Sequence, residues 1–423
     1  MNKPEDTFKQ LLGLGEEWNV ERSHYDEKAS VFELHVQETS KLWITERCPA
    51  DGNDGITCYD HVEEMSWRHL NVFSKECVIL SRLPRGLCPK CGKVYRVTPP
   101  WEGRAKHFTK EFEAFALTLM REMPVNRAAD ILGETDTKMW RVVHGYVDLA
   151  YQQLSMKNVT SVGVDEMSRR KGHQYLSVFC DMLERRVLFA TPGKGAETWD
   201  AFSEALHAHK GKARCIKNVS MDMSPSYISG VKKNCKNAEI VFDKFHVIMN
   251  ANEAVDLVRR AEFRKGNVDV REQLKKSRWL WLKNPKNLTE AQEEHMDRID
   301  HDMIVTSKAY QMRLALQKIY NCKTAAYAAK RFAAWCRWVR KQAAKTKWGL
   351  LNSMVKIANM IESHAAGILA HWDGRLTNAF MEGLNSVFSA VKRRARGFRT
   401  VRNIVAMLYF VAGKLPEPKP VFH

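Results

Sequence analysis

Three carboxylates, spread over more than 200 residues, are the side chains of this chain best suited to chemistry. Asp165 ends an apolar run that begins at Val162, and Asp222 ends a similar run that begins at Val219. The third, Glu382, lies in a segment whose apolar residues have helical spacing. A hard cation such as Mg²⁺ is held by oxygen ligands, usually carboxylates, waters and phosphate oxygens. Converging carboxylates of this kind would therefore predict metal-dependent phosphodiester chemistry.

The elements that would position the first two carboxylates have an informative order. Three antiparallel strands are followed by a helix, a strand, a helix and a strand, which is the ribonuclease-H-like topology. In that topology the first and fourth strands are neighbours, so Asp165 and Asp222 would meet at the strand tips. Two carboxylates at such a short distance repel each other unless a cation neutralises them, which indicates a bound metal ion. The alternative is a cluster of salt bridges. The expected strands are 159–165, 174–181, 186–190, 216–222 and 239–242, and the expected helices are 197–209 and 227–234.

Residues 245–372 show helical spacing and are rich in Lys, Arg, Trp and Ala. This length is too great for a loop in a compact domain, so we expect an inserted all-helical domain, after which the core resumes near Glu382. Its tryptophans could stack on unpaired bases, although at helical spacing they are more often core. They are Trp279, Trp281, Trp335 and Trp338.

The composition is strongly basic. The 423 residues include 67 Lys and Arg against 49 acidic residues, a net charge of +18, and 44% are apolar, enough for a large core. This balance predicts a polyanionic partner, with a generally basic surface as the alternative. The excess gathers after Glu382, where a basic strip is expected to neutralise DNA phosphates, although a charge run alone is more often a solvated face. The strip consists of Lys392, Arg393, Arg394 and Arg396.

No long apolar segment occurs in the chain, and none follows its first residues. We therefore expect neither a membrane protein nor a secreted one, and a location in the cytoplasm. Half of the ten Cys are scattered singly, as expected of reduced core thiols.

The other five Cys cluster between residues 48 and 91, after a predicted strand at 31–38. Cys88 and Cys91 form a CxxC knuckle, which places two thiolates on one tetrahedral ion. A first knuckle begins at Cys48, but Asp51 stands where its second Cys would be. We expect structural Zn²⁺ on Cys48, Cys88 and Cys91, with Cys58 as the fourth ligand. The alternatives are Asp51, His61 or His69 in the fourth position, and a metal-free hairpin domain.

Residues 109–150 change to a pattern of three helices. A first helix runs from Thr109, a second covers 125–132 and stops at Gly133, and a third is capped within 135–137. This layout matches a helix-turn-helix, whose third helix reads the major groove of double-stranded DNA. Any three-helix bundle can show the same layout, so a structural or docking role is the alternative. The residues expected to face bases are Thr137, Lys138 and Arg141.

Nearly the whole chain resembles the ISL-three family of bacterial insertion-sequence transposases, which are DDE enzymes with a ribonuclease-H-like core. The resemblance is carried by the knuckle at 88–91, Trp67-Arg-His-Leu70, the phrases around the three carboxylates, and Trp279 to Asn284. It implies that Asp165, Asp222 and Glu382 are the catalytic triad. It also implies that Asp243 and His246 form the family's D-x-x-H motif; alone they would be read as a buried polar pair.

The resemblance further implies two Mg²⁺ or Mn²⁺ ions, roughly 3.5 to 4 Å apart, bridged by Asp165 and completed by Asp222 and Glu382. The implied reaction cleaves DNA at terminal inverted repeats and joins the 3′-hydroxyl ends to target DNA, in a homodimer or larger oligomer near the nucleoid. Two rivals are a nuclease that does not transpose and a domesticated DNA-binding regulator. The expected domains are a zinc module at 1–108, the helix-turn-helix at 109–150, the core at 158–248 and 373–423, and the insertion at 249–372.

Overall fold

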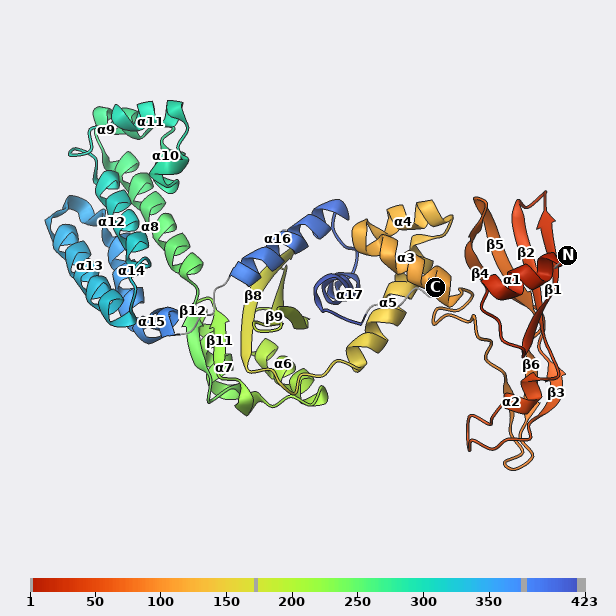
Figure 1. Ribbon diagram of the computed structural model, residues 1–423. Helices are drawn as coiled ribbons and strands as arrows, with labels where there is room; N and C mark the ends of the chain where they lie inside the picture. The colour runs from red at the N-terminus through yellow and green to blue at the C-terminus, as the bar shows by residue number, and fades with distance from the viewer. Residues whose placement is uncertain (1–2, 171–173, 374–378, 417–423) are drawn as a thin grey trace. The chain divides into compact units, whose positions relative to one another are not determined.

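The computed structural model describes residues 3–170, 174–373 and 379–416 (Figure 1). The chain divides into two compact units. One unit comprises residues 1–154 and 390–423, and the other comprises residues 155–389. We expected residues 373–423 to complete the catalytic core as one piece. The division instead falls after Ser389, because the C-terminal helix α17 (Val401–Ala412) packs on α5 (Asp136–Gln152).

The first unit begins with two small sheets. One has the order β1-β2-β5-β4, and its inward residues, including Leu34 and Ile79, pack around Trp67 and Trp101. The other has the order β3-β6-β7 and carries the knuckles. The strand predicted at 31–38 is confirmed as β2. The elements are α1 Pro4–Leu11, β1 Trp18–Asp26, β2 Val31–Glu38, α2 Leu42–Thr45, β3 Thr57–His61, β4 Met65–Val72, β5 Lys75–Ser81, β6 Pro84–Leu87 and β7 Val94–Arg96.

Three helices follow these sheets, and each has a local reason to begin or end where it does. The Thr109 hydroxyl caps α3 by accepting from the N–H of Phe112, and Gly133 ends α4 with a positive φ of 70°. The Thr135 hydroxyl caps α5 by accepting from the N–H of Lys138 at 3.4 Å. The three predicted helices are confirmed as α3 Lys110–Glu122, α4 Val125–Leu132 and α5 Asp136–Gln152.

The second unit contains a five-stranded sheet of order β10-β9-β8-β11-β12. Strands β8, β9 and β10 are antiparallel, whereas β8, β11 and β12 are parallel. The seven predicted elements are confirmed, and the first and fourth strands are neighbours as expected. They are β8 Ser161–Arg170, β9 Gln174–Asp181, β10 Arg186–Pro192, α6 Glu197–Ala208, β11 Asn218–Met221, α7 Pro225–Asn234 and β12 Glu239–Phe242, with a 3₁₀ turn at Ala213–Cys215.

Residues 244–373, hereafter the helical segment, follow β12 and contain helices without any strand (Figure 1). Its last helix returns to the sheet, where Gly367 lies so close to Phe242 that a Cβ would meet the ring at 2.6 Å. Its helices are α8 Lys244–Lys265, α9 Val268–Leu274, α10 Arg278–Leu282, α11 Glu290–Asp297, α12 Val305–Ile319, α13 Ala325–Lys345, α14 Asn352–Ser363 and α15 Ala365–Asp373, with 3₁₀ turns at Pro285–Asn287 and Lys347–Gly349. Helix α16 (Ala379–Arg394) then runs from the second unit into the first.

The four tryptophans that could stack on bases have different environments. Trp281 and Trp335 are buried core residues, and the indole N–H of Trp335 donates to the carbonyl of Met312 at 2.8 Å. Trp338 is half-buried, whereas Trp279 is exposed. Helical spacing therefore indicates the core for two of them, and leaves Trp279 as the one with an accessible ring.

Candidate functional site

Asp165 and Asp222 lie level with each other on neighbouring parallel strands. Each paired residue of β11 follows its β8 partner by 57 positions, from Asn218 opposite Ser161 to Ser220 opposite Gly163. Asp222 follows Asp165 by the same 57 positions, so the register carries it to the level of Asp165 just beyond the end of β11. The sheet itself therefore brings the two carboxylates together.

The expectation that the first strand ends at Asp165 is wrong. Strand β8 continues to Arg170 because β9 keeps pairing with it, and Asp165 pairs with Val178. Only the pairing with β11 stops earlier, since β11 pairs with β8 from Ser161 to Gly163. Asp165 is thus held within a paired strand and still has an open edge towards Asp222.

The carboxylates at this edge repel one another. Burial raises the pKa of Asp165, and the charge of Asp222 raises it further, while the Asn385 amide and the N–H of Glu166 (2.7 Å) lower it. Burial also raises the pKa of Glu166, with Asp222 the next cause and Lys194 opposing it. Neighbouring anions that lack full compensation form the environment that a bound divalent cation would stabilise.

Asp243 and His246 lie at the same edge of the sheet. The main-chain N–H of Asp243 donates to the carbonyl of Met221 at 3.2 Å, and the Asp243 carboxylate caps α8 by accepting from the N–H of Phe245 at 2.9 Å. His246 Nε2 lies 3.9 Å from Asp243 Oδ2. The positive charge of His246 also lowers the pKa values of Asp165 and Glu166, so the ring lies near both carboxylates.

Helix α16 is joined to this edge by Asn385, whose Nδ2 donates to Asp165 Oδ2. Glu382 is in the same helix, three positions earlier, while its side chain lies outside the described residues. Glu166 and Asn385 were not assigned a role from the sequence. Glu166 directly follows Asp165 and Asn385 lies three positions after Glu382, so this adjacency is the signal that the sequence offers.

The two metal knuckles have the same backbone geometry. In one, the N–H of Gly52 donates to the carbonyl of Cys48 at 2.8 Å; in the other, the N–H of Gly92 donates to that of Cys88 at 3.0 Å. Both glycines have positive φ, 71° and 67°, which permits the tight turn. Asp51 therefore occupies in the first knuckle the place that Cys91 occupies in the second.

Four donor groups converge between these knuckles, within 4.8 Å of one another: Cys48, Asp51, Cys88 and Cys91. Cys58 is not among them. It is exposed on β3 with its sulfur 4.0 Å from the carbonyl of Asp60, so the geometry puts Asp51, one of the open alternatives, in the position expected for Cys58. Three thiolates and a carboxylate are donors that Zn²⁺ accepts. Backbone N–H groups lower the pKa values of Cys88 and Asp51, whereas burial raises that of Cys48 to about 11.

The residues expected to face bases are exposed at the start of α5. Thr137, Lys138 and Arg141 project from it, and Lys138 also pairs with Glu134 at 2.8 Å. On the opposite side, Met139 and Val143 are buried. This helix thus has one face in the core and one face available to a partner.

The basic strip lies beside these helices in the first unit. An Arg394 guanidinium nitrogen donates to the carbonyl of Glu122 at 2.6 Å, and Arg399 lies 3.7 Å from Asp136. His144 and Asn403 are 3.1 Å apart, which ties α17 to α5. Arg393, Arg394 and Arg396 are exposed and Lys392 is half-buried. Although α16 also carries Glu382, the strip falls in the same compact unit as the helix-turn-helix.

This combination of a carboxylate-bearing sheet, a thiolate cluster and a three-helix module agrees with the family profiles that match the chain. A transposase profile covers residues 162–408, a zinc-finger profile of the transposases of IS204, IS1001, IS1096 and IS1165 covers 45–91, and a profile for the helix-turn-helix domain of transposase family ISL3 covers 97–147. The chain belongs to the ISL3 family of transposases.

Two relatives are similar over almost their entire length. The transposase for insertion sequence element IS1001 of Bordetella parapertussis is 29% identical over 92% of this chain and 93% of its own. The transposase for IS1557 of Mycobacterium tuberculosis is 25% identical over 97% and 96%. Among solved structures, the chain is similar to a chain of the simian T-cell lymphotropic virus intasome in complex with PP2A regulatory subunit B56 gamma. The sequence identity is 11% and the TM-score is 0.17, over 42% of this chain and 76% of the other.

Among the residues that the structure describes, no helix is long and apolar enough to cross a lipid bilayer.

Proposed function

We propose that this chain is a DDE transposase that binds the terminal inverted repeats of its insertion sequence, cleaves the DNA there and joins the 3′-hydroxyl ends to target DNA. The observation that carries the proposal is the equal register of Asp165 and Asp222 on adjacent strands. The strand order supports a ribonuclease-H-like core, and the helical segment between β12 and α16 supports an inserted all-helical domain.

Asp165, Asp222 and Glu382 would hold Mg²⁺ or Mn²⁺, whose chemistry is to activate a hydroxyl nucleophile and stabilise the leaving oxygen. Positions 382 and 385 share one face of an α-helix, and Asn385 joins that helix to Asp165. Asn385 thereby fixes the direction of the Asp165 carboxylate. His246 and Lys194 offset part of the negative charge around Asp165 and Glu166.

The experiment that tests this proposal supplies the purified full chain with paired end DNA, a target plasmid and Mg²⁺. Cleavage at the ends followed by joining to the target is the expected result. Nicks without joined product would indicate a nuclease, and binding without nicks would indicate a DNA-binding regulator. In such a synaptic complex we expect at least a dimer.

Arg141→Gln is expected to weaken binding to end DNA by roughly 10-fold, because a base contact from the third helix contributes about 1–3 kcal/mol. Binding to DNA without end sequence should change much less. The measurement is a titration of both duplexes by fluorescence anisotropy. Arg402→Gln is the matched control, since Arg402 is exposed in the same unit and pairs with Asp148 at 3.0 Å. An equal loss in the control would contradict a base-reading role for Arg141.

A further inference from the structure

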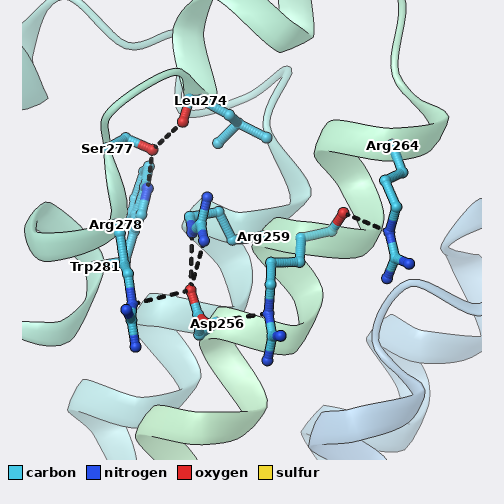
Figure 2. Close-up of polar contacts among 8 residues, drawn as sticks. Asp256, Arg259, Arg264, Leu274, Ser277, Arg278 and Trp281 are labelled. Carbon is cyan, nitrogen blue, oxygen red and sulfur yellow. Dashed lines mark hydrogen bonds and ion pairs between the residues drawn. The ribbon is translucent and has the colours of Figure 1, made fainter.

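One buried carboxylate in the helical segment gathers three guanidinium groups (Figure 2). Asp256, on α8, is 7% exposed and accepts from Arg259 Nε at 2.9 Å and from Arg259 Nη2 at 2.7 Å. Arg260 Nε lies 3.2 Å from the other carboxylate oxygen, and Arg278 Nε lies 3.8 Å from the first. We call these four residues the Asp256 cluster. Its three positive charges and one negative charge leave a net +2.

The arginines of the cluster differ in exposure. The side chain of Arg259 is 14% exposed and is occupied by Asp256, so its role is to balance the buried charge. The side chains of Arg260 and Arg278 are 52% and 56% exposed. These two side chains are thus open to solvent while the carboxylate holds their position. Guanidinium groups held in this way lose little conformational entropy when they bind a phosphate.

The position of Arg278 is fixed by the residues around it. The buried Ser277 hydroxyl donates to the carbonyl of Leu274 at 2.7 Å and accepts from the indole N–H of Trp281 at 3.0 Å, which anchors the start of α10 (Figure 2). The Arg278 guanidinium also lies over the exposed Trp279 ring, 5.2 Å from its centroid. Arg278 is therefore positioned before any partner arrives.

The positive charge continues beyond the cluster along the end of α8. Arg264 Nε donates to the carbonyl of Arg260 at 3.2 Å, and Arg271 donates to the carbonyl of Arg264 at 3.3 Å. Between residues 256 and 278, eight Lys or Arg side chains stand against four acidic ones. One of the four, Glu262, is buried and accepts from the N–H groups of Val305 and Thr306, so its charge does not face this surface.

We propose that the Asp256 cluster is a docking site for the phosphate backbone of duplex DNA, with Arg260 and Arg278 as the contacts. The partner chemistry follows from the row of exposed guanidinium groups, whose planar forks match phosphate oxygens. This inference rests on the proposed function for the identity of the polyanion. It adds a contact outside both the helix-turn-helix and the carboxylate edge.

The test compares the wild type with Arg260→Gln/Arg278→Gln and with Arg260→Gln alone. The full chain is titrated with a mixed-sequence duplex from about 50 to 200 mM salt, without added Mg²⁺ or Mn²⁺. The slope of log affinity against log salt should fall in magnitude by about 1.8 for the double variant and ~0.9 for the single one, one phosphate contact per arginine. Their melting temperatures should stay near that of the wild type.

The matched control is Arg298→Gln/Arg340→Gln. It removes the same charge from the helical segment at two arginines that pair with Glu294 and Glu362 and whose side chains are 76% and 40% exposed. Its slope should equal that of the wild type. An unchanged slope in the cluster variants, or an equal change in the control, would overturn the inference while cleavage by the wild type still supports the proposed function. A wild type that binds no DNA would overturn both.

Discussion

Asp165→Asn, Asp222→Asn and Glu382→Gln should each abolish cleavage of element-end DNA while leaving its binding intact. Each change removes a negative oxygen ligand and keeps the size of the side chain. Loss of a charged ligand is expected to cost several kcal/mol of transition-state stabilisation. The cleavage rate should therefore fall by at least roughly 10²- to 10³-fold. Cleavage is measured on labelled end duplexes with Mn²⁺ or Mg²⁺, and binding on the same duplexes without either ion.

A matched control is available in the same unit. Asp200 is a surface carboxylate on α6 that pairs with Lys233 at 2.8 Å and has no part in the proposed metal site. Asp200→Asn should cleave at the wild-type rate. Full cleavage by the Glu382→Gln variant would remove Glu382 from the mechanism. Full cleavage by Asp222→Asn would contradict the proposed function, which depends on the equal register of Asp165 and Asp222.

Asp165→Asn has a second expected effect, on stability. Since burial raises the pKa of Asp165 in the folded chain, its ionised form is disfavoured by folding. That cost is present at neutral pH and disappears as the pH falls through the folded pKa, the reverse of a salt-bridged aspartate. The metal-free variant should therefore melt no lower than the metal-free wild type at neutral pH. Added Mn²⁺ should raise the melting temperature of the wild type more than that of the variant.

Cys88→Ser should empty the knuckle cluster of zinc and unfold the small sheet β3-β6-β7. Cys88 is fully buried, and its sulfur lies 3.8 Å from Asp51 Oδ2, between the two knuckles. Among the described residues, the buried core there consists of Cys48, Ile56 and Cys88, with Trp43 and Tyr95 partly buried against it, so little apolar area holds the knuckles without the ion. Zinc content, measured by mass spectrometry, should fall from about one ion per chain to near zero, with faster proteolysis between residues 45 and 95.

The choice of the fourth ligand is tested by two further variants. Cys58→Ser should keep its zinc, because Cys58 lies outside the cluster, whereas Asp51→Ala should bind zinc more weakly. Asp51→Cys should bind it at least as well as the wild type, because it restores the second CxxC knuckle. Loss of zinc in Cys58→Ser, with zinc retained in Asp51→Ala, would return the fourth position to Cys58.

Much of the fold could be predicted because periodicity is a local property. The alternation from Val31 to Glu38 and the strand–helix order from β8 to β12 follow from the spacing of apolar residues. The resemblance to the ISL3 family also followed from short motifs, and the profiles confirm it. Local spacing could not show where β8 ends, because its length depends on pairing with β9.

The sequence by itself determined the types of the elements, their order and the kinds of chemistry that their polar residues allow. Only the tertiary structure decided which of those residues meet. It placed Asn385 on Asp165, put Asp51 in the place expected for Cys58, and grouped the strip after Ser389 with the helix-turn-helix. It also joined Arg278 to Asp256 across 22 positions. The physical reason is that periodicity acts within one element, whereas side-chain contacts between elements depend on how the chain returns to itself.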